Sequence, residues 1–294
     1  MTLAALPSLD ATYEVAPGDL DTFRRAGHVK LPGVLEADEL AAYRPHLERV
    51  VFGSPPEHHA MEQKVAGGGK HWTFINNTWQ LDAISRQFVL SRRLGRVASD
   101  LLGGASVRLF RDQSYFKGPG GANTPWHQDA YFMPLATDAI VTFWVPLTDI
   151  TPDMAPMSYV TGSHTRGYLG TSSGDNASMD QFEARMRAEG FGVANYQTFA
   201  AGDIAVHAGM TLHSSRTNTS DRIREAMVIV YFADGATLAP EAPLTWSTPP
   251  EEAFAALIRR QNRATSLPGL QPGQRAAGSM TPLVYPPPPG GSDA

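Results

Sequence analysis

From about residue 105 onward, the sequence is a succession of short β-rich segments separated by turns of Gly, Pro, Asp and Ser, with little helix between them. Two of these segments, AIVTFWVPL at 139–147 and AMVIVYF at 226–232, are apolar at nearly every position. Both faces of these strands are therefore expected to be covered. Many short strands with turn signals are typical of a jelly roll or barrel. We expect a mainly β fold, cupin-like, with flanking helices and a core from about 105 to 233.

The composition of the whole chain is typical of a globular protein. Its 294 residues, of which 42 % are hydrophobic and 18 % charged, can bury a sizeable core. Helical patterns over 20–25 and 36–51 predict flanking helices near the N-terminus. The segment 265–294 is rich in Pro and Gly and is expected to be extended or disordered. We therefore expect a single domain over 1–264.

Charge and composition argue against several classes of partner and chemistry. The formal net charge of −5 and the pI near 6.0 give no electrostatic footprint for nucleic acid or an anionic membrane. The chain has no cysteine, which excludes disulfides, thiolate metal sites and cysteine nucleophiles. The N-terminal sequence lacks a signal-peptide pattern, and no run approaches the roughly 20 apolar residues of a membrane span. We expect a cytoplasmic protein.

Two segments have the character of mobile loops. A triple glycine precedes a cluster of aromatic residues within 65–80, and a long insertion at 165–195 interrupts the strand pattern. Inside the insertion, Ser178 and Gln181 form a predicted capping box for a helix. Long loops within compact domains are usually functional. Both segments are candidate lids, and a strand that packs on the core is an equally good interpretation of 65–80.

The first candidate metal ligands lie in TPWHQDAYFMP, residues 124–134. In a strand, residues i and i+2 point to the same face, so His127 and Asp129 can reach one ion while Gln128 points away. An imidazole and a carboxylate suit a first-row divalent metal. A single His-x-Asp recurs by chance in many proteins, so this pair alone is a weak signal.

The downstream segment 202–227 strengthens that signal. It supplies further histidines, two serines and, at the mouth of a buried strand, Arg224. A charged residue in this position is costly to bury unless it meets an anion, and the planar fork of arginine is suited to a carboxylate. Two histidines and one carboxylate on one face of a metal form the triad of non-haem iron(II) oxygenases. The pattern therefore indicates an iron site with an anion site beside it.

The order of these motifs resembles the phytanoyl-CoA dioxygenase family, whose members are Fe(II)- and 2-oxoglutarate-dependent oxygenases on a double-stranded β-helix. The resemblance begins at AGHVKLPGVL (26–35), passes through KGPGGANTPWHQD (117–129), GSH (162–164) and the distal His-Ser-Ser, and extends to LPGLQPGQ (267–274). It implies Fe(II), 2-oxoglutarate and O2 as cofactor and cosubstrates. The ordered series of motifs is more specific than any one of them.

The resemblance also assigns roles to individual residues. It implies that the metal ligands are His127, Asp129 and His213, and that the far carboxylate of 2-oxoglutarate is bound by Arg224 and Ser215, with Trp144 lining that pocket. His207 competes with His213 as the distal ligand, but Ser215 and Arg224 fit only the register of His213. His207 is then expected to be satisfied locally.

The aspartate at position 129 limits the reaction that the resemblance implies. Halogenating relatives replace this carboxylate with a small residue, so Asp129 favours hydroxylation, or desaturation, cyclisation or epimerisation by the same radical chemistry. The aromatic and Met side chains near the motifs predict a pocket for a small, partly apolar molecule. The residues expected to line it are Trp72, Phe74, Trp79, Tyr115, Phe132 and Met133. A tailoring step in bacterial secondary metabolism is the predicted function.

Two other classes remain as alternatives. One is a cupin-like metal enzyme that does not use 2-oxoglutarate, and the presence of Arg224 and Ser215 argues against it. The other is a non-catalytic small-molecule binding protein on the same scaffold. A binding protein has no need to retain three metal ligands together with an anion clamp, so the intact set argues against this alternative as well.

Overall fold

In the computed structural model, residues 6–54, 72–241, 243–245 and 247–286 are described. The strands are β1 (His28–Leu31), β2 (Trp72–Asn76), β3 (Val107–Lys117), β4 (Thr124–His127), β5 (Ile140–Pro146), β6 (Met157–Thr161), β7 (Gly192–Asn195), β8 (Ile204–Ala208), β9 (His213–Ser215), β10 (Ala226–Ala233) and β11 (Leu283–Tyr285). The α-helices are α1 (Pro17–Ala26), α2 (Ala37–Gly53), α4 (Thr78–Leu81), α5 (Ala83–Val89), α6 (Arg92–Leu101), α7 (Asn176–Ala188) and α8 (Pro250–Ser266). Short 3-10 helices are η2 (Asp129–Phe132), η3 (Pro152–Met154) and η4 (Ser163–Thr165).

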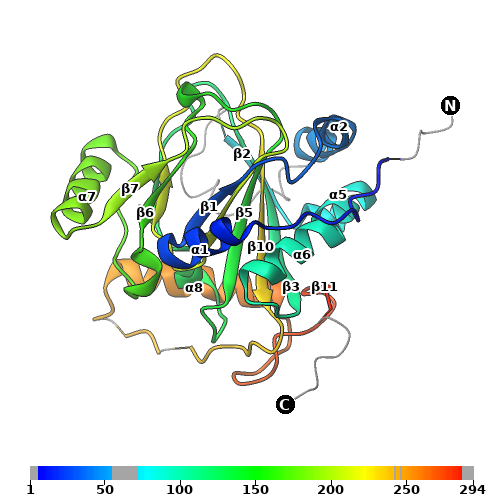
Figure 1. Cartoon of the computed structure of the whole chain (residues 1–294). Coiled ribbons are helices and arrows are strands. Elements are labelled where there is room, and N and C mark those ends of the chain that lie inside the picture. Colours follow the sequence, from blue (N-terminus) through cyan, green and yellow to red (C-terminus); the bar gives the residue numbers. More distant parts are fainter. Residues whose placement is uncertain (1–5, 55–71, 242, 246, 287–294) are drawn as a thin grey trace.

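The strands form two antiparallel sheets (Figure 1). The larger sheet has the order β1-β8-β5-β10-β3-β11, and β2 also pairs with β3. The smaller sheet has the order β4-β9-β6-β7. Neighbours in each sheet are far apart in sequence, as in a jelly roll. The predicted jelly-roll fold with flanking helices is confirmed.

The two central strands are covered on both faces, as their continuous apolar sequence predicts. Every residue of β5 is buried. On β10, Met227, Ile229 and Tyr231 join the core cluster that contains helix residues, whereas Val230 and Phe232 join a second cluster inside the barrel. This alternation follows from the strand pleat, and it gives β10 one face for the helices and one for the barrel interior.

Helices cover the outer face of the larger sheet (Figure 1). Core residues of α1, α2, α5 and α6 pack against outward-facing residues of β1, β3, β5, β8 and β10. Helix α1 ends at Gly27, whose φ of 79° is the left-handed conformation that glycine adopts readily. β1 then begins one residue later and pairs with β8, so this turn fixes how the first helix meets the sheet.

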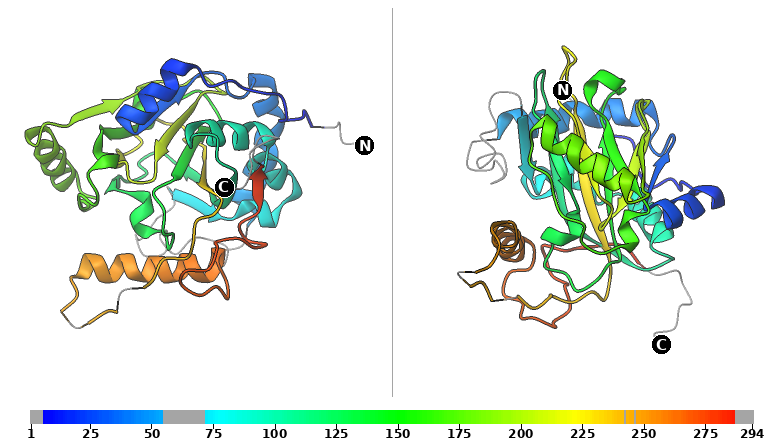
Figure 2. Two further views of the ribbon diagram at one scale, coloured as in Figure 1. Left: turned by 60° about the horizontal axis from the view of Figure 1, so that its bottom comes forward. Right: turned by 90° about the vertical axis from the view of Figure 1, so that its left-hand side faces the viewer.

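Helix α8 was not predicted from the sequence. It lies at the bottom of the molecule in Figure 1, away from the helices that cover the larger sheet, and Figure 2 shows it from two other sides. It is held to η2 by hydrogen bonds from Arg259 Nη1 to the Tyr131 carbonyl, 2.9 Å, and from Asn262 Nδ2 to the Phe132 carbonyl, 2.8 Å. The helix is therefore anchored beside the segment that follows the predicted His-x-Asp motif.

The C-terminal residues continue along the barrel. The expected boundary at residue 264 falls inside α8, which ends at Ser266. The backbone N–H of Leu238 donates to the Gln274 carbonyl, Thr281 is fully buried, and β11 adds to the edge of β3. Residues 267–286 therefore pack along the barrel, mostly as irregular structure with one short strand, and residues 287–294 lie outside the described part of the chain.

The insertion at 165–195 contains α7 and β7. The predicted capping box is wrong, because the N-cap is Asp175, whose carboxylate accepts from the backbone N–H of Ser178 at 2.9 Å. The apolar residues of α7 pack with Trp126 of β4. Since Trp126 and the next residue, His127, point to opposite faces of β4, α7 covers the face of the smaller sheet that is turned away from His127.

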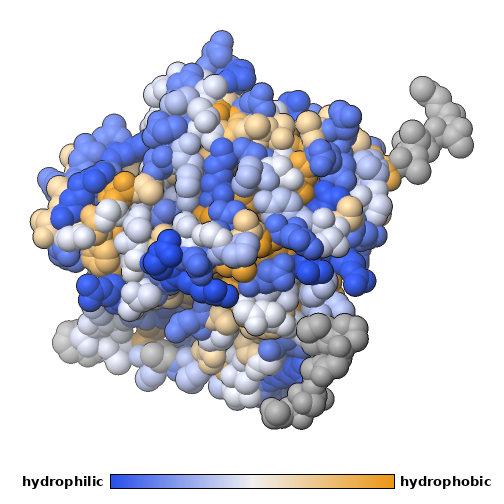
Figure 3. Space-filling view, in the orientation of Figure 1, coloured by the Kyte–Doolittle hydropathy of each residue, from blue (hydrophilic) through white to orange (hydrophobic). Residues whose placement is uncertain are grey.

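The other expected lid, 65–80, is described only from residue 72 onward, where it forms β2 and α4. Residues 65–71 lie outside the described part. On the face seen in Figure 3, hydrophobic residues form small patches among hydrophilic ones. No helix among the described residues is long and apolar enough to cross a membrane.

Candidate active site

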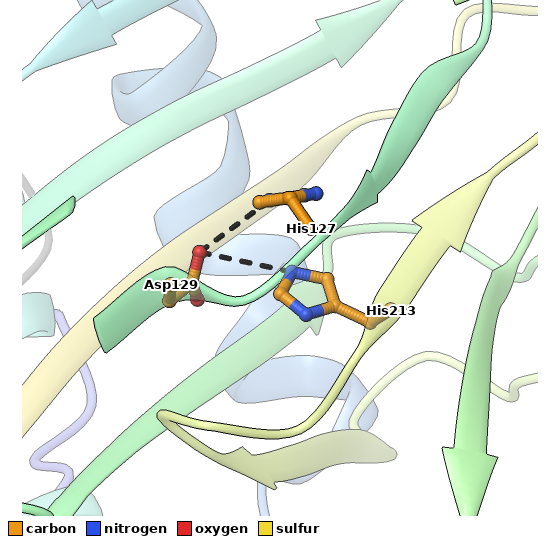
Figure 4. Close-up of side chains that lie close together, drawn as sticks. All are labelled: His127, Asp129 and His213. Atoms are coloured by element: carbon orange, nitrogen blue, oxygen red, sulfur yellow. Dashed lines mark ion pairs between the residues drawn. The ribbon is translucent and has the colours of Figure 1, made fainter. Parts of the chain in front are cut away.

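The smaller sheet brings the three predicted metal ligands together. His127 at the end of β4 lies directly opposite His213 at the start of β9, and Asp129 opens η2 two residues later. One ligand atom from each residue lies within 4.8 Å of the other two. Figure 4 shows the three side chains close together, with Asp129 facing both histidines. The pairing of two strands more than 80 residues apart thus creates the cluster.

Backbone carbonyls orient both imidazoles. His127 Nδ1 lies 2.8 Å from the Pro125 carbonyl and His213 Nδ1 lies 2.9 Å from the Thr211 carbonyl, so each Nδ1 carries the proton. Each Nε2 is then left with its lone pair, at 3.5 Å and 3.7 Å from Asp129 Oδ1. A carbonyl that fixes the tautomer is the usual support of a metal-binding histidine.

Two residues of the larger sheet hold the other oxygen of the Asp129 carboxylate. Thr142 Oγ1 on β5 donates to Oδ2 at 2.8 Å, and His207 Nε2 on β8 lies 3.2 Å from the same atom. The His207 ring also lies 4.1 Å, centroid to centroid, from that of His213. His207, expected from the sequence to be satisfied locally, is therefore a neighbour of two predicted ligands.

The site favours an ionised carboxylate beside a neutral His213, whereas Asp129 outweighs burial and raises the pKa of His127. Burial alone would raise the pKa of Asp129, but the surrounding histidines His213, His127 and His207 outweigh it and hold this pKa well below its usual value. Burial, and then the neighbouring His207 and His127, lower the pKa of His213 well below its usual value. Deprotonated imidazole and carboxylate are the forms that bind a metal. Two imidazoles and one carboxylate suit Fe(II).

Beside this cluster lies an inner chamber of about 60 Å³. Its wall includes Trp144 and Met157 together with His127, Asp129 and His213. The guanidinium of Arg224, which is fully buried, lies 5.6 Å from the Trp144 ring. Burial lowers the pKa of Arg224 to about 10, so it still carries its charge at neutral pH.

Arg224 is anchored by one nitrogen. Its Nη1 donates to the Ala155 carbonyl at 2.5 Å and to Ser215 Oγ at 2.8 Å, while Nε and Nη2 are buried without a hydrogen-bond partner among the described residues. Trp144 Nε1 is unpaired in the same way. Buried donors in native proteins are nearly always satisfied, so this group of donors indicates an acceptor-rich ligand.

A second cation stands next to Arg224 and was not predicted. Lys117, at the end of β3, is fully buried and donates from Nζ to Ser215 Oγ at 2.8 Å and to the Arg216 carbonyl at 2.9 Å. Burial, and secondarily the charge of Arg224, lowers the pKa of Lys117 well below its usual value. Two buried basic groups without an ion pair among the described residues are suited to an anion.

On its other side the cluster opens into an outer cavity of about 300 Å³. Both spaces are lined by Gln113, Tyr115, Thr124, His127 and Asp129, so they meet at the candidate metal ligands. The outer cavity is otherwise mostly aromatic and aliphatic. Its further lining residues are Trp72, Phe74, Arg111, Pro125, Phe132, Thr171, Phe254 and Ile258.

The structure therefore gathers some predicted pocket residues and separates others. Four of the six line the outer cavity, namely Trp72, Phe74, Tyr115 and Phe132. Trp79 instead packs in the core beneath the helices, and Met133 packs in the cluster at the other end of the barrel. Phe254 and Ile258 of α8 were missed because nothing in their local sequence distinguishes them from an ordinary amphipathic helix.

Similarity to known proteins agrees with this geometry. Residues 23–226 match the family described as "Phytanoyl-CoA dioxygenase (PhyH)". A probable alpha-ketoglutarate-dependent hypophosphite dioxygenase from Stutzerimonas stutzeri is 26 % identical over 225 residues, which are 71 % of this chain and 76 % of the relative.

Two solved structures share the fold. One is the epimerase SnoN in complex with Fe3+, alpha ketoglutarate and nogalamycin RO, with a TM-score of 0.68 and 24 % identity, covering 91 % of this chain and 97 % of the other. The other is the alpha ketoglutarate dependent carbocyclase SnoK from nogalamycin biosynthesis, with a TM-score of 0.67 and 23 % identity, covering 95 % and 99 %. The chain belongs to the phytanoyl-CoA dioxygenase family and is a non-haem dioxygenase that depends on Fe(II) and 2-oxoglutarate.

Proposed function

We propose that His127, Asp129 and His213 hold the Fe(II) ion, the histidines through Nε2 and the aspartate through Oδ1. The fit rests on the donor set and on the carbonyls that leave each Nε2 without a proton. When bound, iron with 2-oxoglutarate and O2 supplies the oxidising power for attack on a C–H bond. The chain's own part is to keep the carboxylate ionised and held in place, which Thr142 and His207 do through Oδ2.

In this proposal the inner chamber takes 2-oxoglutarate. Arg224 binds the far carboxylate of the cosubstrate, Ser215 assists through its hydroxyl, and Trp144 lines the chamber. The observation that supports these roles best is the set of buried, unpaired donors at Arg224 and Trp144. Lys117 lies behind Ser215 and donates a hydrogen bond to its hydroxyl. A carboxylate gripped by an arginine fork gains charge-assisted hydrogen bonds, which are about twice as strong as neutral ones.

The outer cavity takes the substrate. Its size and its aromatic walls fit a small, partly apolar molecule. Because Asp129 is present, we propose hydroxylation, or desaturation, cyclisation or epimerisation by the same radical chemistry, and not halogenation. An epimerase and a carbocyclase from nogalamycin biosynthesis share the fold, which supports a tailoring step in secondary metabolism. The proposal includes a cytoplasmic location, where 2-oxoglutarate and reduced iron are both available.

Release of succinate tests this function. Purified protein with Fe(II), 2-oxoglutarate and O2 is screened against a panel of cyclic, partly apolar metabolites, and succinate is quantified alongside oxidised product. We expect at least one compound to stimulate succinate release with matching product, and His213→Ala to abolish both. The matched control His46→Ala, on α2 and outside both spaces, should retain the activity. Equal activity in His213→Ala would contradict the proposal.

A further inference from the structure

Arg111 is a cation in the wall of the outer cavity. It lies on β3 and lines the cavity together with Gln113 and Tyr115 of the same strand. Its Nη1 donates to Asn262 Oδ1 at 3.0 Å. Its Nε is buried without a partner, and it makes no ion pair with any described residue. An arginine that is half-buried in an apolar cavity without a counter-ion indicates that a ligand supplies one.

The guanidinium is held in place by α8. Asn262, which is 5 % exposed, accepts from Arg111 and donates from Nδ2 to the Phe132 carbonyl at 2.8 Å. Because both the oxygen and the nitrogen of the Asn262 amide are hydrogen-bonded, this side chain has little freedom to move. It therefore holds Nη1 of Arg111 in place and leaves the other guanidinium nitrogens for another partner. This resembles the anchoring of Arg224, whose Nη1 is bound and whose Nε and Nη2 are not.

Arg111 is also close to the candidate iron ligands. It shares the lining of the outer cavity with His127 and Asp129. A group bound by Arg111 would therefore lie near the reactive centre, and the rest of the same molecule would lie against the cavity walls.

The aromatic walls of the outer cavity are suited to binding a molecule that contains a ring. Phe74 and Tyr115 are stacked with their centroids 5.3 Å apart, and Trp72 meets Tyr115 edge-on at the same distance. Phe132 of η2 and Phe254 of α8 form a second aromatic contact, at 6.4 Å. Aromatic side chains contribute large apolar areas and favour stacked or edge-to-face contacts with a ring.

We propose that the substrate has a ring-bearing apolar body and a carboxylate, and that Arg111 binds this carboxylate and so determines specificity. The planar fork of arginine fits a carboxylate in a bidentate way, and the low polarity of the cavity strengthens the pair. This inference rests on the function proposed above, because it takes the outer cavity as the substrate site.

The test compares two probes of the same size, 2-naphthoate and its neutral analogue 2-naphthamide. Their dissociation constants are measured by calorimetry under anaerobic conditions on the protein loaded with Fe(II) and 2-oxoglutarate, which occupies Arg224. The wild type should bind 2-naphthoate about 10-fold more tightly than 2-naphthamide. Arg111→Gln should remove this preference while the affinity for 2-naphthamide stays within about twofold, and Arg111→Lys should lie between them.

Arg24→Gln serves as the matched control, since Arg24 is an exposed residue of α1 and its removal changes the net charge equally. It should leave both affinities unchanged. No preference in the wild type, an unchanged preference in Arg111→Gln, or equal loss of both probes in Arg111→Gln would overturn the proposal. The visible band of the Fe(II)–2-oxoglutarate chelate is recorded on the same samples. Its absence in the wild type would contradict the proposed function itself, independently of the probes.

Discussion

The inner chamber and the outer cavity meet at the same candidate ligands, but they are built differently. The inner chamber is lined mostly by strands of the two sheets, and the nearby Arg224 is fully buried. The outer cavity adds residues of β2 and α8, and its Arg111 is partly exposed. Sheet pairing fixes the first space, whereas a helix attached by a few polar contacts completes the second.

Because the two spaces are built differently, we expect them to bind different ligands. In the proposed function, the cosubstrate, which stays the same across related reactions, is bound by the paired strands. A substrate that differs from one enzyme to the next is bound where helices and connecting segments can change without disturbing the sheets. Substitutions in the two spaces should therefore have separable effects on the two ligands.

The largest effect is expected from Asp129, a proposed metal ligand that lines both spaces. Asp129→Ala removes the carboxylate ligand and should lower substrate oxidation by more than about 100-fold, because loss of groups that merely support a metal ligand already costs about 10- to 100-fold. Added chloride should not restore activity. Product formation and bound iron are measured together. Near wild-type turnover in this variant would remove Asp129 from the proposed triad.

The second-largest effect is expected in the inner chamber, on the KM for 2-oxoglutarate. Arg224→Ala should raise the KM for 2-oxoglutarate by about 10- to 100-fold, the equivalent of losing a hydrogen-bonded charge pair, with little change in substrate affinity. Arg222→Ala is the matched control, since this arginine is two residues away, is exposed, and contacts Thr151. Equal effects of the two substitutions on the KM for 2-oxoglutarate would contradict the assignment of Arg224.

A smaller effect is expected in the outer cavity. Phe254→Ala on α8 should weaken substrate binding by about fivefold, since about 1 kcal/mol of apolar contact is lost from a side chain that is 43 % exposed. The KM for 2-oxoglutarate should not change. Leu257→Ala, on the same helix but outside the cavity lining, is the control. A change in the KM for 2-oxoglutarate with Phe254→Ala would break the proposed separation of the two spaces.

The smallest effect concerns the attachment of α8. The Tyr131 hydroxyl donates to Glu252 at the start of the helix, and the Tyr131 ring stacks on Tyr168. Tyr131→Phe should loosen the first turns of α8 and increase amide hydrogen exchange there by a few fold, with exchange in β9 unchanged. Unchanged exchange in α8 would show that this hydrogen bond does not hold the helix.

The sequence predicted the inner chamber better than the outer cavity, for physical reasons. The order of the motifs pointed to His127, Asp129 and His213, and the pairing of β4 with β9 brings the two histidines together directly. Asp129 lies beyond the end of β4, in η2, so the strand pleat used in the sequence argument does not place it. Trp79 and Met133 were placed in the pocket because they are close in sequence to residues that do line it. Sequence proximity does not determine which face of the chain a side chain occupies.

Arg111 could not be predicted from periodicity because the pleat is interrupted beside it. The pairing of β3 with β10 shifts register between Val230 and Tyr231, and Phe110 is the extra residue. Phe110 packs with Val230 inside the barrel, and the adjacent Arg111 also faces the interior. A bulge of this kind re-aims a side chain, and it depends on contacts between strands more than 100 residues apart.

The central claim is that His127, Asp129 and His213 hold iron while Arg224 holds 2-oxoglutarate beside it. The most direct measurement is an anaerobic titration of the protein with Fe(II) and 2-oxoglutarate, followed through the weak visible charge-transfer band of the chelate. We predict a band that requires both additions, is lost in His213→Ala, and needs far more 2-oxoglutarate in Arg224→Ala. Folded wild-type protein that binds the metal but gives no band would contradict the claim.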